Sequence, residues 1–327
     1  MRVLFTTTQW PTPENPSLAP FVLREVESLR NQGVTVEVFV YEGGWRISKY
    51  VQAIRDLRQR IIASDYDIVH ARFGQCGLVA RAQWKVPVVL TYGGSDVEGS
   101  PHFSGWRRYR HYILRLVSWL LSLVVDEVIV VSDQIGRRLP RRNYHVIPSG
   151  VDLSLFQPID QTEARCQLNL PLDRQLILFA GDPTNRRKRY GLAVEVCERA
   201  SRSVDLELVV LSGKPSALVP PYMSASNALL LTSTNEGSPN VVKEALACNL
   251  PVVSVDIGDV RERIGGLNGC AVCASDEPEE IAEALLAVLL RKTKPALRSS
   301  IKDLDIQECA RRTISVYERM LHKSSDD

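Results

Sequence analysis

Two glutamates, Glu236 and Glu244, stand eight positions apart (244 − 236 = 8) on either side of a Gly-Ser-Pro-Asn turn. Ser238 is a favoured N-cap residue, and Pro239 suits the first helical position because its missing N–H is not needed there. Gly237 allows the backbone to turn sharply and a ligand to come close. The sequence therefore predicts a loop that enters a helix, with one carboxylate before the turn and one inside the helix.

The start of a helix beside two acids suggests a particular kind of ligand. A helix N-terminus presents free N–H groups and a partial positive charge, which suits a phosphate group. Two carboxylates that touched a diphosphate would repel it, but they could accept hydrogen bonds from neutral hydroxyl groups on either side of it. One would then hold a sugar and the other a ribose. The alternative is a helix whose first turns carry acids because its dipole stabilises them, and periodicity alone does not separate the two interpretations.

The elements that must position this turn follow a repeating pattern. Strands are predicted at 2–7, 34–41, 67–71, 87–92, 126–132, 144–150, 175–182, 206–213, 227–233 and 251–256. Helices are predicted at 21–33, 50–64, 190–201, 239–249, 278–292 and 305–321. Runs of Val, Ile and Leu separated by helices indicate α/β domains with doubly wound parallel sheets that are covered on both faces. Ligands of such sheets bind outside the carboxyl ends of the strands, where the turn at Glu236 is expected.

The pattern restarts in the middle of the chain, so the 327 residues are expected to form two domains. Pro148, Gly150 and Pro158 punctuate a polar linker between the two halves. We predict an N-terminal domain at 1–155, a second domain at 156–304 and a C-terminal helix at 305–327 that packs back on the first domain. Two doubly wound domains that face each other would leave a cleft between them.

The composition narrows the class of protein. Forty Lys and Arg against 38 Asp and Glu give a net charge of +2, which argues against a dedicated nucleic-acid binder. Cys270 and Cys273 form an isolated C-x-x-C, weak evidence for zinc or redox chemistry, so the seven cysteines are read as reduced thiols. No signal peptide is visible at the start. We therefore expect a cytoplasmic protein.

The apolar stretch 109–132 could suggest a membrane span, but it is interrupted by polar and charged residues: Arg115, Ser118, Ser122, Asp126 and Glu127. A spanning helix needs about 20 mostly uncharged residues. We predict a helix to about Val125, followed by a buried strand. The basic, aromatic residues 106–112 would suit peripheral contact with an anionic membrane at its inner face, or a solvated helix start, which we favour.

The segment 235–260 closely resembles the Glu-x7-Glu segment of retaining nucleotide-sugar glycosyltransferases of family 4, which have the GT-B architecture. Other parts resemble the family in the same order, at 33–39, 67–74, 87–96, 126–132, 146–158 and 187–196. The likeness covers nearly the whole chain. It implies two Rossmann-like domains that face each other across a cleft, with the donor held mainly by the second.

The resemblance also implies roles for individual residues. Glu236 would contact the donor sugar and Glu244 the ribose, while the backbone from Gly237 through Ser238 and Pro239 to Asn240 would lie along the sugar and phosphates. Lys188 would neutralise the diphosphate, which gains charge as the glycosidic bond breaks. No metal and no cofactor beyond the nucleotide-sugar co-substrate is expected. The D-x-D sequences at 65–67 and 303–305 lie away from the expected donor site and are rejected as metal ligands.

The chain departs from the family pattern on the donor side. Asp182 stands where members often have an arginine, so Arg186 or Arg187 could supply the charge, or both could be solvated.

On the acceptor side, Gly93 replaces a common histidine, while Gly94 and Asp96 remain. Asp96 could act at the site or cap the next turn. His70 could point into the cleft, although a satisfied buried histidine is the interpretation that we favour.

These features together predict a retaining glycosyltransferase. It would move a sugar from a nucleoside diphosphate to a hydroxyl of a carbohydrate or lipid-linked acceptor, in the synthesis of cell-surface polysaccharide or glycoconjugate. The departures at Asp182 and Gly93 motivate one alternative, a non-catalytic GT-B subunit that binds a sugar or a partner. The other is a GT-B sugar-nucleotide epimerase.

Overall fold

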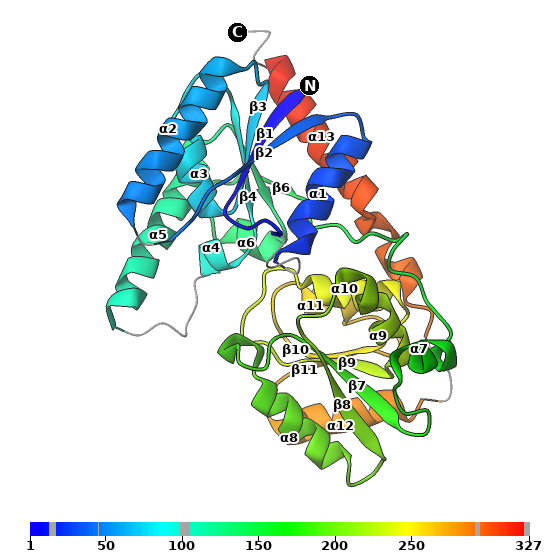
Figure 1. Cartoon of the computed structure of the whole chain (residues 1–327). Helices are drawn as coiled ribbons and strands as arrows, with labels where there is room; N and C mark the ends of the chain where they lie inside the picture. Colours follow the sequence, from blue (N-terminus) through cyan, green and yellow to red (C-terminus); the bar gives the residue numbers. More distant parts are fainter. Residues whose placement is uncertain (13–17, 45, 99–104, 292–294, 324–327) are drawn as a thin grey trace. The chain divides into compact units, whose positions relative to one another are not determined.

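The computed structural model describes residues 1–12, 18–44, 46–98, 105–291 and 295–323, with the backbone alone at Ser95, Glu98, 105–111 and Lys323. The chain divides into two compact units, the first made of Met1–Gly150 with Ile306–Asp327 and the second of Val151–Asp305 (Figure 1). The sequence placed this boundary at residue 155; the structure places it at Gly150. The last helix, α13 (Ile306–Lys323), belongs to the first unit.

The first unit is built on a six-stranded sheet in the order β2-β1-β3-β4-β5-β6. All five strand pairs are parallel. The strands are β1 (Arg2–Thr7), β2 (Thr35–Val40), β3 (Ile68–Arg72), β4 (Val88–Tyr92), β5 (Glu127–Val130) and β6 (His145–Val146). Each central strand is buried on both faces, which is why its sequence reads as a continuous apolar run.

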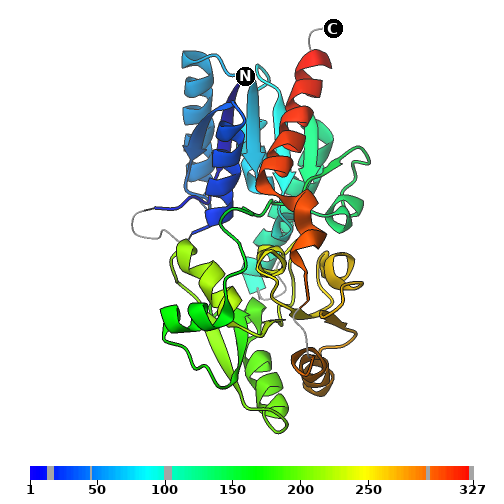
Figure 2. The same cartoon turned by 90° about the vertical axis from the view of Figure 1, so that its right-hand side faces the viewer.

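Helices cover both faces of this sheet because the side chains of each strand alternate. In β1, Val3 and Phe5 pack with α1 (Pro20–Asn31) and α13, whereas Leu4 faces the opposite cluster. Figure 2 shows α13, in red, running alongside the sheet. The opposite face is covered by helices that follow the other strands: α2 (Ile47–Ala63), α3 (Gly74–Ala80), α5 (Gly105–Val124) and α6 (Asp133–Arg137), with the short α4 (Ser95–Glu98) before α5.

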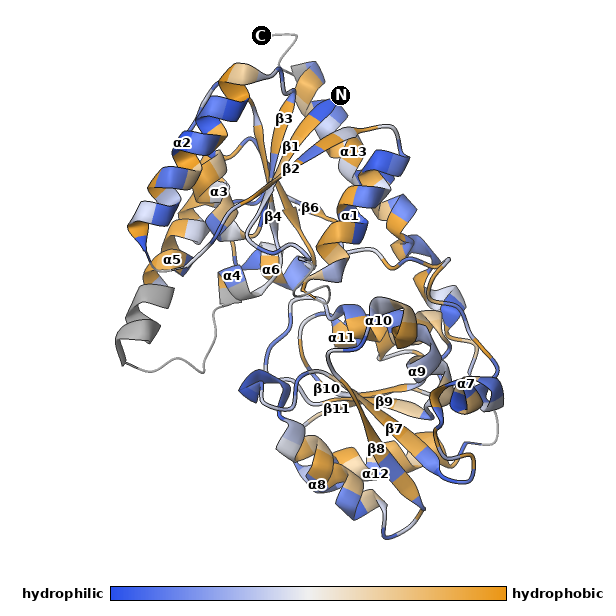
Figure 3. Cartoon of the chain, in the orientation of Figure 1, coloured by the Kyte–Doolittle hydropathy of each residue, from blue (hydrophilic) through white to orange (hydrophobic). Residues whose placement is uncertain are grey.

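The second unit repeats this plan on five parallel strands in the order β11-β10-β9-β7-β8. They are β7 (Gln175–Ala180), β8 (Leu206–Leu211), β9 (Ala228–Leu231), β10 (Val252–Val255) and β11 (Ala271–Cys273). One face packs on α8 (Tyr190–Ala200) and α12 (Pro278–Leu289). The other packs on α9 (Val219–Ala225), α10 (Asn240–Ala247) and α11 (Val260–Ile264), while α7 (Gln161–Leu168) packs against α9. Figure 3 shows the strands as mainly apolar, as two-sided burial requires.

The strand order fixes where each unit can bind a ligand. In both units the second strand lies on one side of the first and the third strand lies on the other. The chain therefore reverses direction across the sheet between β1 and β3, and again between β7 and β9. Doubly wound sheets bind ligands at such a switch point, outside the carboxyl ends of the strands. In the second unit, the residues that follow β7 and β9 occupy this place.

The predicted fold class, two Rossmann-like doubly wound α/β domains, is confirmed. Their facing across a cleft stays a prediction. The stretch 109–132 forms α5 and β5 as expected, and no helix among the described residues is long and apolar enough to span a bilayer. All seven cysteines are free thiols, and burial raises the pKa of Cys270 and that of Cys273, the latter to about 11. Such thiols are poor nucleophiles.

Candidate functional site

The turn after β9 enters α10 one residue later than predicted. Pro239, with φ −66° and ψ 115°, is the N-cap, and Asn240 is the first helical residue. The expectation that Ser238 caps this helix is wrong, because its hydroxyl donates to Asp259 Oδ2 at 2.8 Å. No side chain among the described residues caps the helix start. The first N–H groups of α10 are thus not occupied by a side-chain cap. A helix that binds a phosphate group requires N–H groups in this state.

The loop before α10 is held in place by the segment that follows β10. Asp259, whose side chain is 2% exposed, accepts from Ser238 and pairs with Arg263 at 3.1 Å. Gly258 has φ +52°, and a Cβ there would lie 2.5 Å from the carbonyl oxygen of Glu236. Only glycine allows this approach without strain. The positions of Glu236 and Ser238 therefore depend on two contacts from one neighbouring loop.

Lys188 and Glu236 meet at the switch point of the second unit. Lys188 Nζ lies 2.7 Å from Glu236 Oε1, and Arg187 Nη1 lies 3.6 Å from Oε2. The Lys188 and Glu236 side chains are 17% and 12% exposed, so the pair is partly shielded from solvent. The first distance is that of a charge-assisted hydrogen bond. The structure thus brings together three residues that the sequence assigned to the donor site: Arg187, Lys188 and Glu236.

The backbone of Lys188 is fastened to the ends of β7 and β9. The hydroxyl of Thr232 donates to the Lys188 carbonyl at 2.8 Å, and the Thr234 N–H donates to the Arg187 carbonyl at 2.9 Å. At the end of β7, a Cβ on Gly181 would lie 3.0 Å from Lys188 Cγ, so the lysine stem lies directly over this glycine. The side chain of Lys188 is consequently aimed by two strand ends rather than by its own loop alone.

The other residues of this loop have different roles. Arg186 is exposed at the start of the 3-10 turn Arg186–Lys188. Asp182 accepts from the backbone N–H and the hydroxyl of Thr184, both at 2.8 Å, and these bonds lower the pKa of its carboxyl. Asp182 thus stabilises the loop through these hydrogen bonds, and it does not supply the positive charge of the arginine that family members often have at this position. The sequence did not single out Arg189, which has φ +51° and pairs with Asp276 at 2.6 Å.

Ser233 and Asn240 lie close to Glu236 in the sequence, and each carries a polar side-chain atom without a hydrogen-bond partner among the described residues. Within the described part of the chain, Asn240 Oδ1 and Ser233 Oγ are buried without a hydrogen-bond partner. A buried polar atom without a partner is costly, and such atoms in native structures call for an explanation. Glu244 lies in the second turn of α10 and is half-buried. Asn240 belongs to the segment that was predicted to lie along the sugar and phosphates, where a ligand hydroxyl could donate to its Oδ1.

Asp96, which the sequence assigned to the acceptor side, organises two loops of the first unit. Its carboxylate accepts from the N–H groups of Gly74 at 2.9 Å, Gly94 at 2.8 Å and Gly93 at 3.2 Å. Gly94 has φ +122°, a conformation that glycine adopts readily. This geometry agrees with the capping interpretation of Asp96. A direct catalytic role for Asp96 stays a prediction.

His70 does not face solvent on the acceptor side. It is 0% exposed, its Nδ1 is bonded to the Tyr317 hydroxyl, and its Nε2 lies 2.7 Å from Thr91 Oγ1. Burial, with a smaller contribution from Arg72, lowers the pKa of His70 to about 3. The ring is therefore neutral, and both of its nitrogens are engaged inside the unit.

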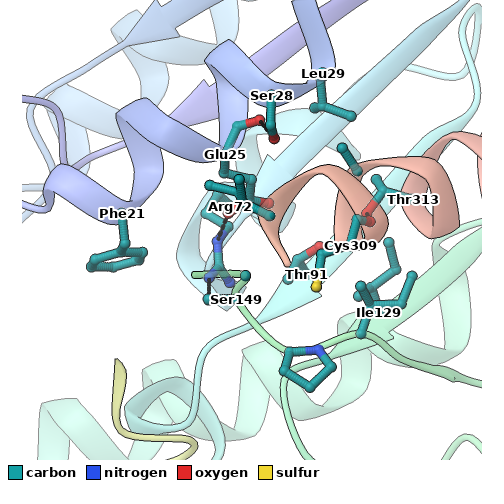
Figure 4. Close-up of a pocket in the computed structure, with 15 residues that line it drawn as sticks. Phe21, Glu25, Ser28, Leu29, Arg72, Thr91, Ile129, Ser149, Cys309 and Thr313 are labelled. Atoms are coloured by element: carbon teal, nitrogen blue, oxygen red, sulfur yellow. Dashed lines mark hydrogen bonds and ion pairs between the residues drawn. The ribbon is translucent and has the colours of Figure 1, made fainter. Parts of the chain in front are cut away.

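Sequence reasoning missed the buried Arg72 at the end of β3. Its side chain is 2% exposed; Nε pairs with Glu25 Oε2 at 3.0 Å, and Nη2 donates to Ser149 at 2.9 Å (Figure 4). Its Nη1 is buried without a partner among the described atoms. Phe73, the next residue, has φ +79° and ψ +146°, a conformation that costs a non-glycine residue about 1–3 kcal/mol. The only signal was an arginine at the end of an apolar strand.

Comparisons with known proteins find a family model of glycosyltransferases that matches the sequence of each unit. The family model described as Glycosyltransferase Family 4 matches residues 5–155, and the model described as Glycosyl transferases group 1 matches residues 174–291. A Bacillus subtilis (strain 168) protein, named provisionally as the teichuronic acid biosynthesis glycosyltransferase TuaC, is 28% identical over 232 residues, covering 65% of this chain and 58% of that relative. The matches span 58–60% of the lengths of this and two further curated relatives.

Two solved structures share the fold of the chain. Sucrose-phosphate synthase from Thermosynechococcus elongatus matches with a TM-score of 0.82 at 17% identity, covering 98% of this chain and 99% of its own. Anabaena Alr3699/HepE, solved in complex with UDP and glucose, matches with a TM-score of 0.75 at 16% identity, covering 98% of this chain and 100% of its own. At these identities the likeness concerns the fold alone.

Proposed function

We propose that this chain, which belongs to the glycosyltransferases of family 4 and has their GT-B architecture, transfers a sugar from a nucleoside diphosphate to a hydroxyl group. The acceptor would be a carbohydrate or a lipid-linked carbohydrate. Both units support the proposal, since a family model of glycosyltransferases matches each of them. The remaining support comes from the chemistry of the second unit.

The observation that carries the proposal is the Lys188–Glu236 pair at the switch point between β7 and β9, beside the start of α10. A nucleoside diphosphate carries negative charge. Lys188 and Arg187 are two cations in the loop that follows the carboxyl end of β7. When a diphosphate enters, Lys188 can exchange its bond to Glu236 for one to a phosphate oxygen. The uncapped N-terminus of α10 would supply further N–H donors.

Glu236 then becomes available to the donor sugar. Once Lys188 turns to the diphosphate, the carboxylate of Glu236 can accept hydrogen bonds from sugar hydroxyls. Asn240 Oδ1, which has no partner in the described chain, could accept from a further hydroxyl. Glu244, one turn along α10, would accept from the ribose. These roles follow the family resemblance and use groups with the required hydrogen-bonding character.

In the proposed reaction the side chains act mainly on the leaving group. As the bond between the sugar and the diphosphate breaks, negative charge grows on the diphosphate, and a fixed cation such as Lys188 stabilises it. We propose that this stabilisation needs no metal ion and that the new bond keeps the anomeric configuration of the donor. An acceptor hydroxyl held close to the anomeric carbon would complete the transfer.

The pathway is proposed from the relatives. TuaC is named for the biosynthesis of teichuronic acid, and Alr3699/HepE was solved with UDP and glucose. We propose by analogy a role in cell-surface polysaccharide or glycoconjugate synthesis, with a UDP-sugar as the first donor to test. We propose that the reaction takes place in the cytoplasm, at the inner face of the membrane if the acceptor is lipid-linked.

A donor screen tests this function. The purified chain would be incubated with UDP-, GDP- and ADP-sugars and an acceptor panel, with and without EDTA, and products followed by NMR. We expect one donor to give a glycoside of unchanged anomeric configuration, at the same rate in EDTA. An inverted product would contradict retention, and loss of activity in EDTA would contradict the metal-independent mechanism.

The same screen separates the alternatives. Nucleotide binding without turnover of any donor would overturn the proposed activity in favour of a non-catalytic binding subunit. Isomerised donor in the absence of acceptor would overturn it in favour of an epimerase.

A further inference from the structure

Helix α5 leaves an apolar face uncovered. Among the described residues, 15 large apolar side chains are exposed, and six of them lie on α5. We define the α5 stripe as these six: Tyr112, Ile113, Leu116, Leu120, Leu123 and Val124, each between 42% and 58% exposed. Ile113, Leu116, Leu120 and Leu123 follow one another at spacings of three or four residues, and Val124 lies four residues after Leu120, which places them on one side of a helix. Figure 3 marks apolar residues along this helix.

The other side of α5 packs into the first unit. Leu121 is 7% exposed and joins the core cluster, while Ser118 and Ser122 are 3% and 0% exposed. The helix is therefore fixed in rotation, and the α5 stripe faces outward on the described surface. A contiguous exposed apolar surface of this kind usually marks an interaction site.

An exposed tryptophan extends the stripe at its C-terminal end. Trp84 is 75% exposed, and the guanidinium carbon of Arg81 lies 3.2 Å from its ring centre. Arg81 Nε also donates to the carbonyl of Val124 at 2.8 Å, which ties this pair to the end of α5. An indole ring beside a cation is typical of residues that lie at a membrane–water interface.

Cations surround the stripe. Arg115 lies on α5 itself, and Lys85 follows Trp84. Trp119 Nε1 donates to the Arg138 carbonyl at 2.9 Å, and Arg141 donates to the Asp126 carbonyl at 2.8 Å, so the arginine-rich segment 137–142 lies beside the end of α5. The sequence from 99 to 125 contains no acid. In the sequence, the acids that flank this stretch are Glu98, Asp126 and Glu127. Glu127 is buried, and Asp133, further along the chain, pairs with Arg137 at 2.6 Å.

We infer that the α5 stripe and Trp84 dock on an anionic lipid bilayer. The apolar side chains would enter the headgroup boundary while the surrounding arginines and Lys85 pair with lipid phosphates. A second copy of the chain fits less well, because self-association through this face would bring its arginine clusters together. The inference uses the first unit only and does not depend on the donor site. It concerns residues 112–124 and their neighbours, since the side chains of 106–111 lie outside the described residues.

Vesicle flotation tests the inference. The protein would be mixed with vesicles of phosphatidylcholine alone or with an equal part of phosphatidylglycerol. We expect binding to the anionic vesicles only, falling as salt is raised because the cations are screened. The variant L116Q/L120Q should lose at least about tenfold in vesicle affinity, because two apolar side chains no longer leave water. The variant R115Q/R142Q should lower binding to anionic vesicles.

A matched control comes from the second unit. Leu172 and Leu290 are 58% and 71% exposed and lie away from α5 in the sequence. The variant L172Q/L290Q should bind vesicles as the wild type does, and all variants should keep the wild-type melting temperature and nucleotide affinity. Equal vesicle binding by L116Q/L120Q and wild type would overturn the inference. A wild-type protein that ignores vesicles, yet forms a dimer that L116Q/L120Q dissociates, would assign the face to a second copy instead.

Discussion

Lys188 is the residue on which the proposed chemistry depends most. Replacing it by alanine removes the cation beside the leaving diphosphate, and we expect kcat/KM to fall by about 10²–10³-fold, as when one preorganised stabilising group is deleted elsewhere. Lys188→Arg keeps the charge and should recover part of the rate. Lys302→Ala, at an exposed lysine of the same unit, is the control. Initial rates with the best donor measure the effect, and equal rates in Lys188→Ala and wild type would reject the assigned role.

His70 makes the stability of the first unit depend on pH. Its pKa is about 3 in the folded chain against an ordinary value of 6.5. Between these values the unfolded chain binds a proton that the folded chain does not. The contribution of His70 is therefore fully present above about pH 6.5 and is lost as the pH falls towards about 3.

The effect of His70 can be measured as a difference between the wild type and His70→Asn in the pH dependence of the free energy of unfolding. Between about pH 7.5 and about pH 5, the free energy of unfolding of the wild type should fall by about 2 kcal/mol more than that of His70→Asn. All five tryptophans lie before residue 120, so tryptophan fluorescence in urea follows the first unit. The same pH dependence in both proteins would show that His70 is not the group responsible.

At the scale of elements, the loop after β10 positions the loop before α10. Gly258→Ala would place a Cβ 2.5 Å from the Glu236 carbonyl oxygen at φ +52°. We expect a loss of about 1–2 kcal/mol in stability and weaker nucleotide binding, because the left-handed conformation strains alanine and the clash moves Glu236. Gly191→Ala is the control, since Gly191 lies in the first turn of α8 and no atom of the described residues lies within 4 Å of the position of its Cβ. Melting curves and nucleotide titrations of both variants check this prediction, which fails if Gly258→Ala binds nucleotide as the wild type does.

The long elements could be read from the sequence, whereas details set by distant residues could not. β1 spans 2–7 as predicted, because its apolar pattern is local. Helix α10 starts one residue later than predicted, because the Ser238 hydroxyl donates to Asp259, which lies 21 positions away, and does not cap the helix. Helix α3 was not predicted, since its seven residues are too few to show a clear period.

The site shows the same division. Lys188 and Glu236 were found through a motif and do lie together. Arg72 was missed because its burial depends on Glu25 and Ser149, which lie 47 and 77 positions away. The structure agrees with the favoured interpretation of His70 as a satisfied buried histidine. Its place in the sequence gave no sign that the partner of one ring nitrogen would be Tyr317, which lies 247 positions on.

At the scale of the whole molecule, the chain passes between its units twice, at 150/151 and at 305/306. Removing residues 306–327 should unfold the first unit, because Val316, Tyr317 and Met320 cover one face of its sheet. We expect the tryptophan fluorescence of the shortened chain to lack a cooperative urea transition. A sharp transition at the wild-type midpoint would show that the first unit is stable without α13.

The central claim is that the Lys188–Glu236 site binds a nucleoside diphosphate. Isothermal titration of the wild type, Lys188→Ala and Lys302→Ala with UDP, GDP and ADP tests it most directly. We predict that the wild type and Lys302→Ala bind at least one of these nucleotides with the same affinity and that Lys188→Ala binds it at least about tenfold more weakly. Equal affinity in Lys188→Ala and wild type, or no binding of any of the three by the wild type, would contradict the account.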